Sequence, residues 1–82
     1  MNQSLLSVLP AGSATITRRE AEILHMMSQG KSNKEIASSL HISTQTVTKH
    51  TKNIYRKLDV HNKIEALNKT KWLIVSLFNN RN

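Results

Sequence analysis

The chain has 82 residues and carries 12 Lys or Arg against 5 Asp or Glu, a net charge of +7. This length holds one small domain, and the absence of cysteine excludes disulfides and any cysteine-ligated zinc site. In residues 1–30 two Arg balance two Glu, so the whole basic excess lies in residues 31–82. A polyanion is therefore the expected partner, with nucleic acid favoured over an acidic membrane.

Residues 1–15 are expected to form a leader or linker. Pro10 ends a short apolar run, and the Ala-Gly-Ser that follows is typical of flexible chain. This segment lacks the pattern of a secretory signal. The longest apolar run, at 72–75, is far below the roughly 20 residues that span a bilayer. We therefore expect a cytoplasmic protein with no membrane contact.

The first helix is expected to open at Thr17. The Thr17 hydroxyl suits an N-cap, and Glu20 three residues later completes the spacing of a capping box. Apolar residues then recur at helical spacing. Gly30 is expected to end the helix, because glycine readily takes the left-handed conformation found there.

A second, shorter helix is expected from Ser32 or Asn33. Ser32 and Glu35 repeat the capping-box spacing, and the apolar face that follows is about two turns long. The connection at 41–43 is tight. Within it, Ile42 is expected to fill the core between two helices.

The third helix is predicted over 44–58, with Ser43 as its cap. It carries four basic residues and no acidic one. Thr51 is a polar break in its apolar stripe. That stripe follows helical periodicity and consists of Val47, Ile54 and Leu58.

The fourth helix is expected to begin near Asn62, which is a good cap, and to give way to a frayed tail at 79–82. Ile64 is expected to pack inward. Its predicted face also holds Leu67, Ile74 and Phe78. No strand pattern is present, so the predicted fold class is all-α, a four-helix helix-turn-helix domain over residues 16–78.

A short helix, a tight turn and a longer basic helix form the pattern of a DNA-reading unit. A recognition helix fits the major groove when a second element braces it across the phosphate backbone. Base-reading side chains must point away from the core stripe, which selects Thr48, Lys49 and Lys52. Hydroxyls and basic groups near helix ends suit phosphate, and these are Lys34, Ser43, Thr44, Thr46, Arg56 and Lys57. Taken alone, each lysine is equally well explained as an ordinary solvated surface charge. Because they are grouped on one helix without acids, DNA binding is favoured.

Neither a metal site nor a catalytic site is expected. The four histidines have no cysteine partners and no metal-like spacing. The chain has only two glycines, which excludes a glycine-rich phosphate loop. Its acids are too few and scattered for paired-carboxylate chemistry. We expect no cofactor and no enzymatic activity.

Several motifs in order along the chain resemble the LuxR/GerE-type DNA-binding domain. They are Ile-Thr-Arg-Arg-Glu at 16–20, Gly-Lys-Ser-Asn-Lys-Glu-Ile-Ala at 30–37, Ile-Ser at 42–43, Thr-Val at 46–47, His50 and Lys-Leu at 57–58. The resemblance implies a four-helix domain of the winged-helix-like superfamily, without a wing. It also implies a bacterial transcription regulator whose third helix enters the major groove.

Carried over by position, the resemblance points to the same three base-facing residues. It also makes Thr46 a phosphate-binding residue and His50 a packing or phosphate-contact residue. Two positions depart from the family pattern. Thr48 stands where members usually carry lysine, which bears on the target sequence. Thr51 stands where an apolar residue is common, which bears on how tightly the helix packs.

The resemblance further implies a homodimer formed through the fourth helix. Its candidate contacts are Ala66, Leu67 and Thr70. Such a dimer would bind two half-sites about one helical turn apart, or a multiple of that distance. An alternative reading is a protein-interaction module, in which the apolar segment 72–78 holds RNA polymerase or a second regulator. A module like sigma-factor region four would share the charge pattern and act only inside a polymerase complex.

Overall fold

The computed structural model describes residues 15–78 and forms four helices in that range, with no strand. The helices are α2 (Arg18–Ser28), α3 (Asn33–Leu40), α4 (Thr44–Leu58) and α5 (Lys63–Phe78). The predicted all-α fold is confirmed. The tail predicted at 79–82 and all but the last residue of the leader predicted at 1–15 lie outside the described residues.

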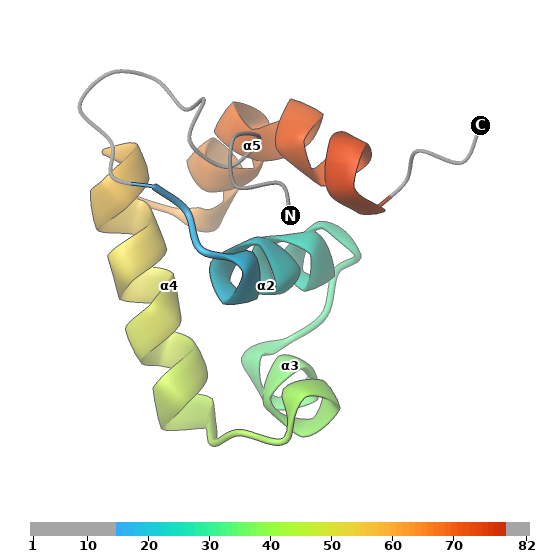
Figure 1. Cartoon of the computed structure of the whole chain (residues 1–82). Helices are drawn as coiled ribbons and strands as arrows, with labels where there is room; N and C mark the ends of the chain where they lie inside the picture. Colours follow the sequence, from blue (N-terminus) through green and yellow to red (C-terminus); the bar gives the residue numbers. More distant parts are fainter. Residues whose placement is uncertain (1–14, 79–82) are drawn as a thin grey trace.

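Helix α2 lies at the centre of the domain and contacts each of the other three helices (Figure 1). On one side of it, α3 and α4 are joined by a tight turn. On the other side lies α5. Three elements therefore fix the position of α4, since α2, α3 and α5 all pack against it.

Two of the N-caps follow the capping-box spacing predicted from the sequence. The Thr17 hydroxyl accepts a hydrogen bond from the Glu20 amide at 3.1 Å, and Glu20 Oε1 accepts one from the Thr17 amide at 3.0 Å. Ser32 and Glu35 make the same pair of bonds, at 3.1 and 2.8 Å. Each box satisfies amides that the first helical turn would otherwise leave without partners.

Three helices end in one shared geometry, with a left-handed residue followed by an amide that bonds back five residues. The left-handed positions are Gly30 (φ 84°), His41 (φ 59°) and Asp59 (φ 59°). The backward bonds run from Lys31 to Met26, from Ile42 to Ala37 and from Val60 to Tyr55, at 3.0–3.1 Å. These are Schellman ends. Only the first carries the glycine that the sequence prediction relied on.

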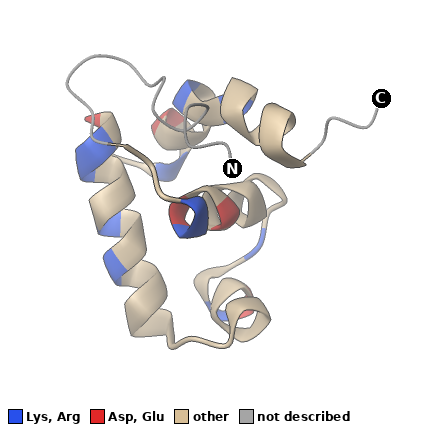
Figure 2. Ribbon diagram, in the orientation of Figure 1, with Lys and Arg blue, Asp and Glu red and all other residues tan. Residues whose placement is uncertain are grey.

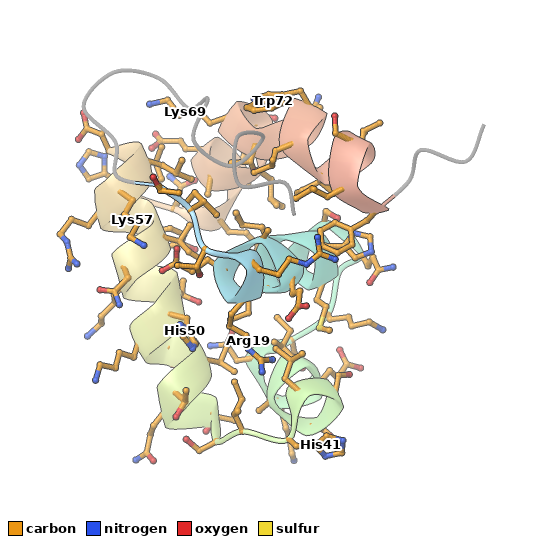
Figure 3. The ribbon with its side chains drawn as sticks, in the orientation of Figure 1. Arg19, His41, His50, Lys57, Lys69 and Trp72 are labelled. Carbon is orange, nitrogen blue, oxygen red and sulfur yellow. The ribbon has the colours of Figure 1, made fainter. Side chains whose placement is uncertain are left out.

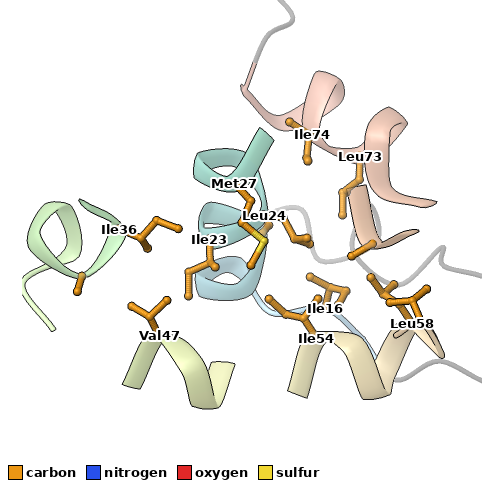
Figure 4. Close-up of a cluster of buried hydrophobic side chains, with 14 residues drawn as sticks. Ile16, Ile23, Leu24, Met27, Ile36, Val47, Ile54, Leu58, Leu73 and Ile74 are labelled. Atoms are coloured by element: carbon orange, nitrogen blue, oxygen red, sulfur yellow. The ribbon is translucent and has the colours of Figure 1, made fainter. Parts of the chain in front are cut away.

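Apolar side chains from all four helices form one continuous core (Figure 4). The core stripe predicted for α4 is confirmed, because all three of its residues are buried. Ile42 is half-buried and packs against the core, as expected for the turn. Thr51 does not interrupt α4, since its hydroxyl donates to the Val47 carbonyl at 2.9 Å. The hydroxyl that interrupts the apolar stripe is therefore hydrogen-bonded within the helix.

The face of α5 that packs inward agrees with the predicted one at Ile74 and differs from it at Ile64. Ile64 was expected to be buried, and instead 72% of it is exposed. The buried residues of α5 are Ala66, Thr70, Leu73 and Ile74. Leu67 and Phe78 are only half-buried. The helix is thus rotated about its axis relative to the expectation.

The last residue of α5 is held against α2 by its aromatic ring. The Phe78 ring stacks on the His25 ring with centroids 4.3 Å apart and an interplanar angle of 6°. The Arg18 guanidinium lies over the same ring, 4.8 Å from its centroid. This contact fixes the C-terminal turn of α5, so the helix runs through to Phe78 despite its β-branched residues.

Candidate nucleic-acid interface

The outward side of α4 is the most basic surface that one helix of the domain presents. Ser43 caps the helix by accepting a hydrogen bond from the Thr46 amide at 3.0 Å. The buried stripe faces α2 and α3, so the opposite side faces solvent. Lys49, Lys52 and Arg56 are exposed on that side, and no acidic residue lies within α4 (Figure 2). An anion approaching this side meets positive charge from Lys49 to Arg56.

The three residues predicted to read bases are all exposed. Lys49 and Lys52 lie near the centre of the outward side. Thr48 lies on its flank, because consecutive helical residues differ by about 100° around the axis. The two lysines therefore project most directly away from the core.

Most of the residues predicted to bind phosphate fall into two groups. Lys34, Thr44 and Arg56 are exposed and free to reach a ligand. Ser43 and Thr46 already serve the cap, and their hydroxyl oxygens lie 2.9 Å apart. A hydroxyl in such a pair keeps acceptor capacity and loses part of its freedom to reorient. His50, on the flank of α4, is half-buried (Figure 3).

Lys57 was predicted to bind phosphate, but its ammonium group is held within the domain. Its ammonium donates to both carboxylate oxygens of Glu20 on α2, at 2.8 and 3.0 Å, and to the Thr15 carbonyl at 3.1 Å. Only 19% of the Lys57 side chain is exposed (Figure 3). The group is committed to bracing α4 against α2, so we remove it from the phosphate-binding set.

The predicted dimer contacts also need correction. Ala66 and Thr70 are fully buried within the single chain, and the Thr70 hydroxyl donates to the Ala66 carbonyl at 2.7 Å. Neither side chain has surface left for a second molecule. Of the predicted set, only Leu67 reaches the surface of α5.

Exposed apolar side chains do line the outer side of α5. They are Ile64, Trp72 at 41% exposure and Val75 at 51%. Two hollows lie beside them, one of about 560 Å³ bounded by Lys71, Trp72, Val75 and Ser76. The second, of about 330 Å³, lies where α5 meets the end of α2, at Ser28.

One exposed residue of α4 was missed by the sequence prediction. Gln45 lies four residues before Lys49, on the same outward side, and is exposed. Its side chain is neither basic nor a hydroxyl, and the predicted interface held only basic and hydroxyl groups and one histidine. The i, i+4 spacing to Lys49 is the signal that identifies it.

Two further findings concern the described residues as a set. Within 15–78, no three side chains of the His, Asp or Glu type are grouped so as to hold a metal ion. None of the helices described here is long and apolar enough to cross a membrane.

A short bracing helix, a tight turn and a basic helix with a free outward side together define a helix-turn-helix domain of the DNA-binding class. The chain belongs to the family described as bacterial regulatory proteins, luxR family, whose model matches residues 14–70. The resemblance found in the sequence is thereby confirmed. The domain is that of a transcription regulator.

Several known proteins are similar to part of the chain. An uncharacterized response regulatory protein of Escherichia coli, YgeK, is 52% identical over 52 residues, covering 63% of this chain and 35% of that protein. The nitrate/nitrite response regulator NarP of the same organism is 49% identical over 53 residues, covering 65% of this chain and 25% of NarP. This chain therefore spans a quarter to a third of their length.

A solved structure matches the fold as well. The response regulator ChrA of a heme-sensing two-component system aligns with a TM-score of 0.69 and 38% identity. The alignment covers 73% of this chain and 30% of ChrA. This likeness supports the helix-turn-helix fold described above.

Proposed function

We propose that this domain binds double-stranded DNA in a sequence-specific manner, with α4 in the major groove. The observation that carries the proposal is the outward side of α4, where Lys49, Lys52 and Arg56 lie opposite the core with no acid among them. A lysine can donate to guanine O6 and N7 in the major groove or to phosphate. The protein would act in the bacterial cytoplasm, as a regulator of transcription.

The phosphate backbone would be held on both sides of α4. Thr44 is exposed in the first turn of α4, beside the turn that joins α3 and α4, and Lys34 is exposed in the first turn of α3, at the opposite end of that helix. Arg56 lies at the opposite end of α4. Contacts of this kind set the position of a recognition helix, while base contacts supply specificity.

Salt dependence tests this proposal. Binding to random duplex DNA should weaken as the salt concentration rises. The logarithm of the binding constant should fall against the logarithm of the salt concentration with a slope of about −0.9 per phosphate contact. In Lys49→Ala/Lys52→Ala, the slope should become shallower by up to about 2 if both lysines meet phosphate in non-specific complexes. The control Lys63→Ala/Lys71→Ala removes the same charge from α5 and should change the slope by less than half as much. Equal effects in the two double variants, or binding indifferent to salt, would refute a DNA surface on α4.

We further propose that two copies associate through the outer side of α5. Ile64, Leu67 and Val75 recur at spacings of three and eight residues, which places them along one side of the helix. Two of them are at least half exposed, at 72% and 51%. An exposed apolar stripe of this kind marks an interaction surface. A second copy is the occupant proposed here, because a two-fold dimer matches paired half-sites.

Sedimentation equilibrium tests the dimer. The variant Val75→Glu places a charge within the stripe and should remain monomeric at concentrations where the wild type dimerises, with or without operator DNA. The control Ser39→Glu adds the same charge to an exposed position of α3 and should leave the association unchanged. A wild type that stays monomeric even on two half-sites contradicts the proposal.

The protein-interaction alternative has one specific observation in its favour. Trp72 and Val75 border the larger hollow on α5, which lies apart from α4. RNA polymerase or a second regulator would fit such a surface if the dimer does not cover it. Salt-independent DNA binding together with a monomeric wild type would favour this alternative over the proposed function.

A further inference from the structure

We propose that Gln45 is a base-reading residue of α4 and that it specifies an adenine in each half-site. This inference rests on the DNA-binding function proposed above. It goes further by assigning a base to one position of the target and by naming the side chain that selects it.

Gln45 belongs to the outward stripe of α4. Gln45, Lys49, Lys52 and Arg56 follow spacings of four, three and four residues. At about 100° per residue, each of the three basic residues falls within about 40° of Gln45 around the helix axis. All four side chains are exposed, whereas the core stripe lies on the opposite side. Gln45 is therefore the first member of the line of side chains that a groove would meet.

The amide of Gln45 is free to bind a ligand. Its neighbours Ser43 and Thr46 are occupied with each other, because Ser43 Oγ accepts the Thr46 amide and the two hydroxyls pair at 2.9 Å. Across residues 15–78, no hydrogen bond engages the Gln45 side chain. The cap thus leaves Gln45 with both its donor and its acceptor unused.

Adenine is the base that this group recognises best. A glutamine amide can accept from adenine N6 and donate to N7 at the same time, a pairing that no other base pair offers in the major groove. The N-terminal turn of a recognition helix is also the part that approaches base edges most closely. The simpler reading, a solvated glutamine chosen only as a good helix former, explains its presence. It does not explain its alignment with the two lysines.

The spacing along α4 also limits where the adenine lies. Gln45 and Lys49 are separated by four residues, or about 6 Å along the helix. Successive base pairs lie about 3.4 Å apart along DNA. The adenine should therefore lie within about two base pairs of a guanine bound by Lys49, because lysine prefers guanine O6 and N7.

Selection from a random duplex pool tests this assignment. The wild type should enrich a half-site with an adenine close to guanine. Gln45→Ala should lose the preference at the adenine position alone, with discrimination there falling from about tenfold or more to near one. Gln45→Glu should change the preference at that position toward cytosine, because a carboxylate accepts from cytosine N4. Thermal melting should be close to wild type for both variants, since the side chain is exposed.

Gln29→Ala makes the same change at an exposed glutamine after α2 and should select the wild-type sequence. If both Gln45 variants select the wild-type sequence with affinity retained, the inference about Gln45 is overturned and the proposed function stands. If the wild type enriches no sequence and binds duplex DNA without salt dependence, the proposed function fails and the inference fails with it.

Discussion

Lys57 of α4 donates to both carboxylate oxygens of Glu20 on α2, and Glu20 also accepts from the Thr17 amide through Oε1. One buried carboxylate thus joins the start of α2 to the last turn of α4. Side-chain exposure is 5% for Glu20 and 19% for Lys57. The pair fixes the angle at which α4 presents its outward side.

Removing the cation of this pair should destabilise the domain strongly. Lys57→Met leaves the Glu20 carboxylate buried without its counter-charge, at an expected cost of about 3 kcal/mol. Urea denaturation followed by the fluorescence of Trp72 measures the change. Adding Glu20→Gln to that variant should recover part of the loss, because the buried charge is then gone. The exposed control Lys63→Met should change stability by less than about 0.5 kcal/mol. A Lys57→Met protein as stable as that control would mean that the pair does not brace α4.

Replacing a strained residue at the end of α4 should stabilise the domain. Asp59 holds a left-handed conformation, with φ 59° and ψ 50°, and its negative charge lies at the negative end of the helix dipole. Asp59→Gly relieves both costs and should raise the free energy of unfolding by up to about 1 kcal/mol. Asp59→Asn removes only the charge and should give a smaller gain. An equal gain from the asparagine variant would show that charge, not backbone strain, dominates at this position.

Acid should weaken the domain in part through Glu35. A hydrogen bond from the Ser32 amide, and then one with the Ser32 side chain, holds the pKa of Glu35 below its ordinary value of 4.5. A depressed folded-state pKa stabilises the fold above the unfolded value, and that stability is lost as pH falls through the folded value. Unfolding measured between pH 6 and pH 3 should therefore depend less on pH in Glu35→Gln than in the wild type below about pH 4.5. Parallel curves for the two proteins below that pH would exclude this contribution.

The ring of Phe78 should contribute to stability out of proportion to its position at the end of α5. Phe78→Leu keeps an apolar side chain and removes both the stacking on His25 and the cation–π contact with Arg18. The expected loss is about 1–2 kcal/mol, from the combined size of such contacts. Val75→Ala, at a half-exposed position of the same helix, is the control. Equal losses in the two variants would indicate that the ring contacts of Phe78 add nothing beyond the removal of apolar surface.

The sequence predicted those features of the fold that depend on residues close together in the chain. Both capping boxes follow from pairs three residues apart, and the core stripe of α4 follows from helical periodicity. Such features need no knowledge of the tertiary packing. The boundaries of α4 were therefore predicted correctly.

The incorrect predictions all depend on how helices pack against each other. Apolar residues occur on more than one side of α5, so periodicity alone did not show that Ile64 faces outward and Ala66 inward. Likewise, nothing near Lys57 in the sequence identifies Glu20, 37 residues away, as its partner. The base-reading set and the dimer surface remain proposals for the same reason, because both depend on a second molecule.

The central claim is that α4 presents its outward side to the bases of the major groove. Amide chemical shifts of ¹⁵N-labelled protein, recorded while a selected half-site duplex is added, test it most directly. The largest changes should fall on the outward stripe of α4, from Gln45 to Arg56, with smaller changes in the first turn of α3. Changes confined to α5, or spread evenly over the lysines of the whole surface, would contradict it.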